Sequence, residues 1–231
     1  MKVRILVLII LAVSLFSCER NDMLILSKMA KVDGLQLWFE DKITYDTSTS
    51  IVQKWTDNVY GTVLDSTVTA PLVVTLPGGS HALKFTASSN IQHSSWGKTI
   101  SQPFTIFAAM AIDYGLASNL IFSSGGFSFY YTGSLIYFNA GSSLSWPSGG
   151  PLIQNLNYYC FIVYNSGFVD IYRNGNYETT ISSIGINSIN DIVFGGNTNH
   201  NFTIASFMVY NRILTAEERD IIFSYLNSYV K

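Results

Sequence analysis

The chain has 231 residues, of which 48% are hydrophobic and only 12% are charged, and its formal net charge is -2. A chain of this length buries enough surface to fold without disulfides, and single all-β domains often reach about 200–250 residues. Because no cluster of Lys and Arg occurs, we expect no nucleic-acid partner. The two cysteines, Cys18 and Cys160, suggest no disulfide framework.

The N-terminus has the pattern of an export signal. Basic residues precede an apolar run over residues 5–16, which is shorter than the roughly 20 residues that span a bilayer. The pattern predicts a signal peptide over residues 1–17. The segment LFSC at 15–18 resembles the lipobox of bacterial lipoproteins, which implies cleavage before Cys18 and a lipid on its thiol. Residues 18–32 would then form a tether. The alternatives are an ordinary signal peptide cut elsewhere or an uncleaved N-terminal anchor.

From residue 33 onward, about a dozen short runs rich in aromatic and β-branched residues alternate with polar turns. This spacing is typical of strands in a sandwich or jelly roll. The mostly apolar run at 103–112 predicts a central strand buried on both faces. The dipeptide Asn174-Gly175 predicts a tight β-hairpin, because both residues tolerate the positive φ of a type I′ turn.

The C-terminal segment has the pattern of a capped amphipathic helix. Thr215 and Glu218 have the spacing of a capping box, and Glu217 and Glu218 suit the positive end of a helix dipole. Ile222, Leu226 and Tyr229 fall on one helical stripe, with Ile221 and Tyr225 beside it. We therefore expect this helix to pack against the outside of a sheet.

Several segments, in this order, resemble the laminin-G-like, concanavalin A-like jelly-roll family over residues 33–231. They are LQLWFE, VQKWTDNVYG, HALKF, PFTIFAAMAI, LNYYCFIVYNSGFVDIYRNGNYETT and DIVFGGN followed by TIASFMVYNRILTAEERDIIFSYLNSYV. The resemblance implies an all-β, two-sheet antiparallel β-sandwich with a short C-terminal α-helix. It does not name a ligand, since one fold serves many functions.

Carboxylates offer no pattern for glycoside hydrolysis. Glycosidases of the wider fold class carry carboxylates alternating along one strand, which places acid and nucleophile on one face. Here Glu40-Asp41 are adjacent and should point to opposite faces of a strand. Glu217 and Glu218 are explained by capping, and Asp170 has no carboxylate two positions away. The sequence therefore predicts a non-catalytic domain, with a glycoside hydrolase as the less favoured alternative.

Calcium is a possible cofactor, because laminin-G-like relatives often bind it through loop oxygens. Oxygen-rich segments occur at Asp57-Asn58 and at residues 197–201, but neither has a regular ligand spacing. The alternative for Asp57 is a turn residue that bonds its own backbone. No metal ligand is assigned. The histidines form no zinc pattern; they are His81, His93 and His200.

Two tryptophans in polar segments are the candidate carbohydrate-binding residues. Trp96 and Trp146 each stand among small polar residues, which suits a sugar lying on a flat ring with hydrogen-bonding groups nearby. The alternative is that these tryptophans fold back and plug the edge of the sandwich. Trp38 and Trp55 lie in strand-like segments and are expected in the core.

The sequence thus favours a carbohydrate-binding or adhesion module displayed at the cell envelope by a lipid on Cys18, either periplasmic or on the cell surface. A glycan is the expected partner. The alternative function is a structural or protein-interaction domain of a surface complex. Glycan binding that is lost with Trp96→Ala or Trp146→Ala would distinguish the two.

Overall fold

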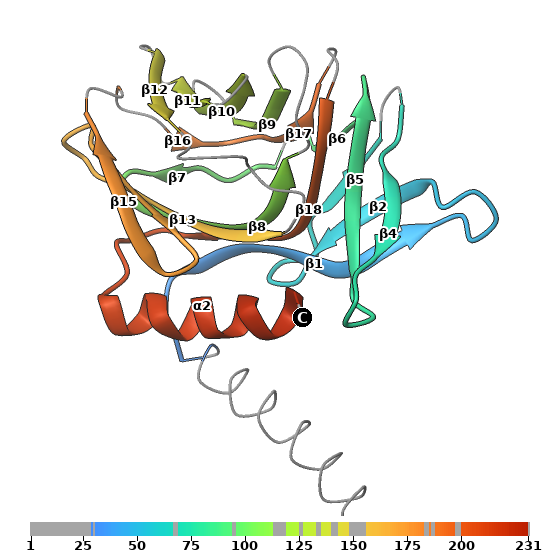
Figure 1. The fold of residues 1–231 in the computed structure, drawn as a ribbon, viewed down its shortest axis with the longest axis horizontal. Helices are drawn as coiled ribbons and strands as arrows, with labels where there is room; N and C mark the ends of the chain where they lie inside the picture. Colours follow the sequence, from blue (N-terminus) through green and yellow to red (C-terminus); the bar gives the residue numbers. More distant parts are fainter. Residues whose placement is uncertain are drawn as a thin grey trace, which may run out of the picture.

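The computed structural model describes residues 29, 31–66, 69–93, 96–112, 119–124, 127–132, 135–139, 143–147, 156–182, 185, 188–196 and 200–230 (Figure 1). The predicted signal peptide, Cys18 and most of the predicted tether lie outside these ranges. Among the described residues, no helix has the length and apolar character needed to cross a membrane.

The strands form two layers with one helix against the outside of one layer (Figure 1). The layer beside the helix, here called the helix-side layer, contains in spatial order β1 (Leu35–Tyr45), β18 (His200–Tyr210), β8 (Phe104–Ile112), β13 (Asn157–Val163), β14 (Val169–Arg173) and β15 (Asn176–Ile181). The far layer contains in spatial order β12 (Ser143–Pro147), β11 (Leu135–Asn139), β10 (Phe127–Thr132), β9 (Asn119–Ser124), β17 (Ile192–Gly195) and β6 (Asn90–His93).

The remaining strands join or flank these layers. Strands β2 (Val52–Asp57) and β3 (Val63–Asp65) connect β1 to β6, so the hydrogen bonds continue from one layer into the other. Strand β1 has a register irregularity between Phe39 and Ile43, and such bulges bend strands. Strands β4 (Leu72–Thr75) and β5 (His81–Ala87) pair beside β18, and β7 (Ile100–Ser101) pairs with β16 (Ser188–Ile189). This is the predicted all-β antiparallel sandwich.

Aromatic side chains fill the space between the layers. The ring of Phe207 on β18 lies 4.8 Å from Phe122 on β9 and 4.9 Å from Phe194 on β17, measured between centroids. Phe104 on β8 meets Phe127 on β10 at 5.7 Å. Trp55 is fully buried in the same cluster, as expected from the sequence. Aromatic rings contribute large buried areas, so this cluster is the main source of hydrophobic stabilisation.

Strand β8 is buried along its whole length, which confirms the prediction of a central strand. Its side chains alternate between the two sides of the sheet. Ile106 and Ala108 enter the core between the layers, whereas Phe107 and Ala109 face the helix side.

Helix α2 (Ala216–Val230) covers the outer face of the helix-side layer (Figure 1). On the helix face that meets the sheet, Ile222 and Leu226 are fully buried, and the ring of Phe223 lies 5.4 Å from that of Phe107 on β8. The predicted stripe is therefore the buried face of the helix. Trp38 is only partly buried here and packs edge-on against Tyr225 at 5.9 Å.

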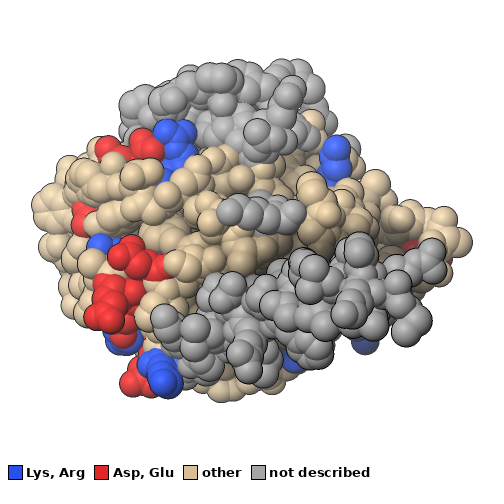
Figure 2. Space-filling view, turned by 60° about the horizontal axis from the view of Figure 1, so that its bottom comes forward, with Lys and Arg blue, Asp and Glu red and all other residues tan. Residues whose placement is uncertain are grey.

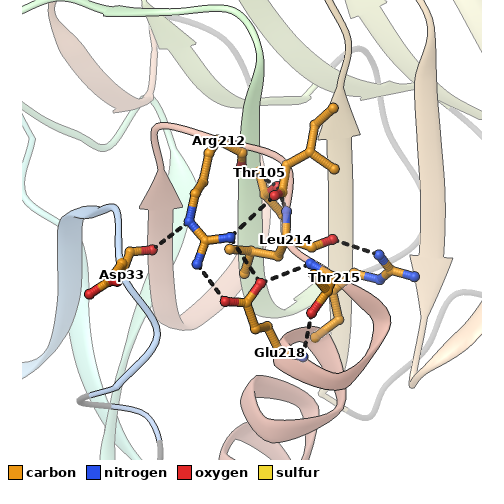
Figure 3. Close-up of polar contacts among 8 residues, drawn as sticks. Asp33, Thr105, Arg212, Leu214, Thr215 and Glu218 are labelled. Carbon is orange, nitrogen blue, oxygen red and sulfur yellow. Dashed lines mark hydrogen bonds and ion pairs between the residues drawn. The ribbon is translucent and has the colours of Figure 1, made fainter.

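The predicted capping box is present at the start of α2 (Figure 3). The Thr215 backbone N–H donates to Glu218 Oε2 at 2.9 Å, and the Glu218 N–H donates to Thr215 Oγ1 at 3.3 Å. Arg212 also donates to Glu218, and its Nε donates to the carbonyl of Asp33 at 3.0 Å. These contacts fix the helix start against the beginning of the domain. The Arg212 guanidinium lowers the pKa of Glu218 to about 2.

The end of the predicted tether is packed against the domain. Met29 and Val32 are buried in the hydrophobic cluster under α2. The Val32 N–H donates to the Met29 carbonyl at 3.0 Å. The folded unit therefore includes residues before position 33.

Candidate functional site

The structure does not present Trp96 as a binding platform. Its side chain is only 7% exposed and belongs to the core cluster between the layers. Its indole N–H donates to Thr62 Oγ1 at 3.1 Å. A ring with both faces packed cannot stack on a sugar, so the expectation of an open ring at Trp96 is wrong. The alternative, a tryptophan folded back to close the sandwich, is what the structure contains.

Trp146 lies on strand β12 rather than in a loop, where its backbone pairs with Ile136 of β11. Its side chain lies outside the described part of the chain. Strand β12 is five strand positions from β6, which precedes Trp96, and at about 4.8 Å per strand this is on the order of 20 Å. The strand that carries Trp146 is therefore well separated along the far layer from the strand that precedes Trp96.

The adjacent carboxylates of β1 are held by the helix and not by a cleft. Glu40 is 5% exposed and accepts a hydrogen bond from the Tyr225 hydroxyl, while Asp41 accepts one from the Tyr229 hydroxyl at 2.8 Å. Both therefore bond to the same helix, which the expectation of opposite faces did not foresee. Burial raises the pKa of Glu40 to about 7, although the Tyr225 hydrogen bond partly opposes the shift.

The oxygen-rich turn at Asp57 is occupied by backbone donors. The backbone N–H groups of Val59 and Tyr60 donate to its two carboxylate oxygens at 3.1 and 2.7 Å, and the backbone N–H of Trp38 donates a third bond at 2.7 Å. Asp57 is therefore a turn residue, as its alternative predicted. Within the described ranges, no group of three or more His, Cys, Asp and Glu side chains is placed to hold a metal ion.

A different surface combines an exposed aromatic ring with convergent polar groups. It lies on the outer side of β13–β15, beside the start of α2, and is here called the outer-hairpin patch. The predicted Asn174-Gly175 turn builds it, with φ of 51° and 84° at its two residues. This turn places Tyr172 opposite Tyr177 and Asp170 opposite Thr180. The patch consists of Tyr164, Asp170, Tyr172, Tyr177, Thr180 and Arg219.

Hydroxyl groups of the patch converge on the Asp170 carboxylate. Tyr164 donates to Oδ2 at 2.7 Å, and Thr180 donates to Oδ1. Since the single Thr180 proton is directed at Asp170, the Tyr177 hydroxyl is the donor in its 2.7 Å bond to Thr180 Oγ1. Burial and the bond to Asp170 raise the pKa of Tyr164 to about 12, which keeps this phenol protonated.

The Tyr177 ring is both exposed and held in place. It is 56% exposed, and its centroid lies 5.5 Å from that of Tyr172 in an edge-on arrangement. The guanidinium of Arg219 lies 4.7 Å from the Tyr172 ring and donates to the Leu214 carbonyl at 2.8 Å. Restraint of an exposed ring before binding reduces the entropy lost on binding.

Charged residues gather near the patch. Figure 2 shows acidic and basic side chains of the described residues toward the left of the view, the side where β13–β15 and the start of α2 lie in Figure 1. Arg173 and Glu178 form an ion pair at 2.8 Å. The two opposite charges therefore largely neutralise each other within the protein.

No sequence motif indicates this patch. In the sequence, Asp170 is a candidate only as a catalytic carboxylate, and Tyr172 and Tyr177 belong to no binding motif. The Asn174-Gly175 turn was the available signal, because it fixes which residues of β14 face those of β15. A register irregularity between Ile171 and Tyr172 then shifts the pairing, and the sequence gives no sign of it.

Comparison with known proteins supports the fold. No family model matches the chain, and no curated protein matches it. The binding domain of botulinum neurotoxin serotype D has a TM-score of 0.65 at 14% identity, covering 83% of this chain and 52% of its own length. The receptor binding domain of the botulinum neurotoxin C/D mosaic serotype has a TM-score of 0.63 at 14% identity, covering 83% and 51%.

A second kind of protein shares the fold. The Trypanosoma rangeli sialidase in complex with sialic acid has a TM-score of 0.60 at 15% identity, covering 86% of this chain. The present chain corresponds to 34% of that sialidase and to about half of the toxin domains. At these identities the likeness establishes the fold alone, an all-β sandwich.

Proposed function

We propose that this chain is a non-catalytic glycan-binding module of the laminin-G-like family. The observation that carries the proposal is the outer-hairpin patch, in which the exposed Tyr177 ring lies beside the Asp170 carboxylate and its hydroxyl partners. Sugars combine apolar C–H faces with many hydroxyls. A restrained aromatic ring next to hydrogen-bonding groups matches both features.

The likeness to binding domains is consistent with this proposal. One neighbour is the receptor binding domain of a neurotoxin, and another is a sialidase in complex with sialic acid. A sandwich of this kind supplies a rigid frame, and rigid strands position side chains more precisely than loops do.

A binding role is favoured over hydrolysis by the state of the nearby carboxylates. Retaining glycosidases place two carboxyl groups about 5–5.5 Å apart, with both free to act on the substrate. Asp170 accepts hydrogen bonds from Tyr164 and Thr180, and Glu178 is paired with Arg173. Glu40 lies beneath α2, where a polysaccharide has no access.

The proposal includes display at the cell envelope by a lipid on Cys18. A diacyl chain contributes about 0.8 kcal/mol for each buried CH₂ group. Metabolic labelling with a fatty-acid analogue, followed by Cys18→Ser, tests this part separately. Loss of label in the variant supports lipidation at Cys18, and unchanged label contradicts it.

A glycan array probed with the full-length protein in detergent tests the binding role. The test variant is Tyr177→Ala, and the matched control is Tyr60→Ala, which removes another tyrosine that is 52% exposed on a different turn. Specific glycan signals should weaken about tenfold or more with Tyr177→Ala and persist with Tyr60→Ala. An array without signal above background, with and without calcium, would favour the alternative of a protein-interaction domain.

A further inference from the structure

Four side chains of the outer-hairpin patch have hydrogen-bonding capacity left of one kind only; they are Tyr164, Asp170, Tyr177 and Thr180. The hydroxyl protons of Tyr164 and Thr180 are directed at Asp170, and the Tyr177 proton is directed at Thr180. A carboxylate offers about four lone-pair positions, so Asp170 keeps free positions on both oxygens. The Tyr177 oxygen also keeps its lone pairs. What remains in these four side chains is acceptor capacity.

The basic groups in and beside the patch do not reverse this preference. Arg173 is paired with Glu178 at 2.8 Å. Arg219 belongs to the patch; it donates to the Leu214 carbonyl at 2.8 Å and to the Tyr172 hydroxyl at 3.4 Å, and its guanidinium lies 4.7 Å from the centroid of the Tyr172 ring. Glu217, two positions before Arg219, is an exposed carboxylate in the same helix turn. Two N–H groups of Arg219 are thus directed at protein acceptors on the Tyr172 side of the patch, whereas the Asp170 carboxylate keeps unused acceptor positions beside Tyr177 and Thr180.

A ligand suited to this surface must donate hydrogen bonds. Each hydroxyl of a neutral sugar carries a proton and can donate to Asp170 or to the Tyr177 oxygen. A carboxylate, sulfate or phosphate group has acceptors only, and it also meets the negative charge of Asp170. Charge-assisted hydrogen bonds are stronger than neutral ones, whereas juxtaposed like charges disfavour binding.

We infer that the outer-hairpin patch selects neutral glycans and rejects acidic ones, with a pyranose ring lying on Tyr177 and its hydroxyls donating to Asp170. This inference rests on the proposed glycan-binding function and specifies its ligand class. It separates this chain from a surface built for uronic acids, sialic acids or sulfated sugars, which would need free cationic donors.

The test uses pairs of oligosaccharides that differ only in charge. Each neutral probe is matched with the same chain oxidised to a uronic acid at one position, and the full-length protein is titrated with both. We expect the neutral member to bind at least tenfold more tightly. This ratio is measured on the unmutated protein, so it does not depend on the folding of any variant.

Two variants then assign the selectivity to one group. Asp170→Asn removes the charge and keeps the shape, and it should reduce the ratio to below about threefold while weakening neutral binding several-fold. Glu217→Gln removes a nearby charge outside the patch and should leave the ratio unchanged. Circular dichroism spectra of both variants establish that the fold is retained.

The outcomes are distinguishable. Acidic probes that bind as tightly as neutral ones, or an unchanged ratio in Asp170→Asn, overturn the inference while glycan binding itself stands. A protein that binds no probe of either class overturns the proposed function and this inference with it.

Discussion

Replacement of Glu40 by glutamine is expected to remove a pH dependence from the folding stability. Glu40 is buried between β1 and α2, and its carboxyl accepts a hydrogen bond from Tyr225. The buried Trp38 indole N–H and Ser206 hydroxyl lie near this carboxyl and, like Tyr225, oppose the rise of its pKa. Burial raises the pKa of Glu40 from 4.5 to about 7, because a charged carboxylate is disfavoured away from water.

The sign follows from the direction of this shift. Between pH 4.5 and about 7 the folded protein keeps the Glu40 proton, whereas the unfolded chain releases it. The free energy of unfolding therefore falls as the pH rises through this interval, by about 1.4 kcal/mol for each pH unit. Over the whole interval the loss is about 3 kcal/mol, and no further loss follows from this group above pH 7.

Urea unfolding of the wild-type protein and Glu40→Gln, followed by tryptophan fluorescence from pH 4.5 to 8, measures the effect. The contributions of the other titrating groups cancel in the difference between the two free energies of unfolding. This difference should shift by about 3 kcal/mol in favour of the variant as the pH rises. Tyr225→Phe is the matched variant. Loss of its hydrogen bond should raise the pKa of Glu40 further, so the decline should still begin near pH 4.5 but extend to higher pH.

A difference between Glu40→Gln and the wild-type protein that stays constant from pH 4.5 to 8 would refute this reasoning. It would mean that the carboxyl has the same proton affinity in the folded and unfolded states. A decline that ends at a lower pH in Tyr225→Phe than in the wild-type protein would equally contradict the assigned role of the tyrosine.

Three further changes separate structural from binding residues. Trp96→Ala should lower the free energy of unfolding by about 3–5 kcal/mol in urea titrations, because it empties a buried site; unchanged stability would mean that the ring is not packed. Gly195→Ala should reduce the soluble yield and the melting temperature, since a Cβ would lie 2.2 Å from the Ser89 carbonyl oxygen at a φ of +75°; a wild-type melting curve would contradict this. Arg212→Ala should destabilise the protein because it removes the partner of Glu218 and the bond to Asp33; a control Lys54→Ala, at an exposed strand position, should not.

Local patterns in the sequence were sufficient for the elements that depend on local chemistry. The Thr215–Glu218 capping box and the Asn174-Gly175 turn each involve neighbours in the chain, and both were predicted correctly. The strand at residues 104–112 was also foreseen, since a long apolar run between breakers is buried wherever it lies.

The candidate site was less accessible from the sequence, because it depends on contacts between distant residues. Trp96 stands in a polar segment, yet its ring packs in the core and its indole N–H donates to Thr62. Glu40 and Asp41 bond to tyrosines nearly 190 positions away. The patch around Asp170 depends on a register irregularity in the β14–β15 pair, and no residue pattern predicts this irregularity.

The most direct test of the glycan-binding account is calorimetric titration of one neutral oligosaccharide, identified on the array, against wild-type protein, Tyr177→Phe and Tyr177→Ala. The account predicts that Tyr177→Phe, which keeps the ring, binds within a few-fold of the wild-type protein. It predicts that Tyr177→Ala binds at least about tenfold more weakly. Equal affinity of Tyr177→Ala and the wild-type protein would contradict the account, because the exposed ring would then have no part in binding.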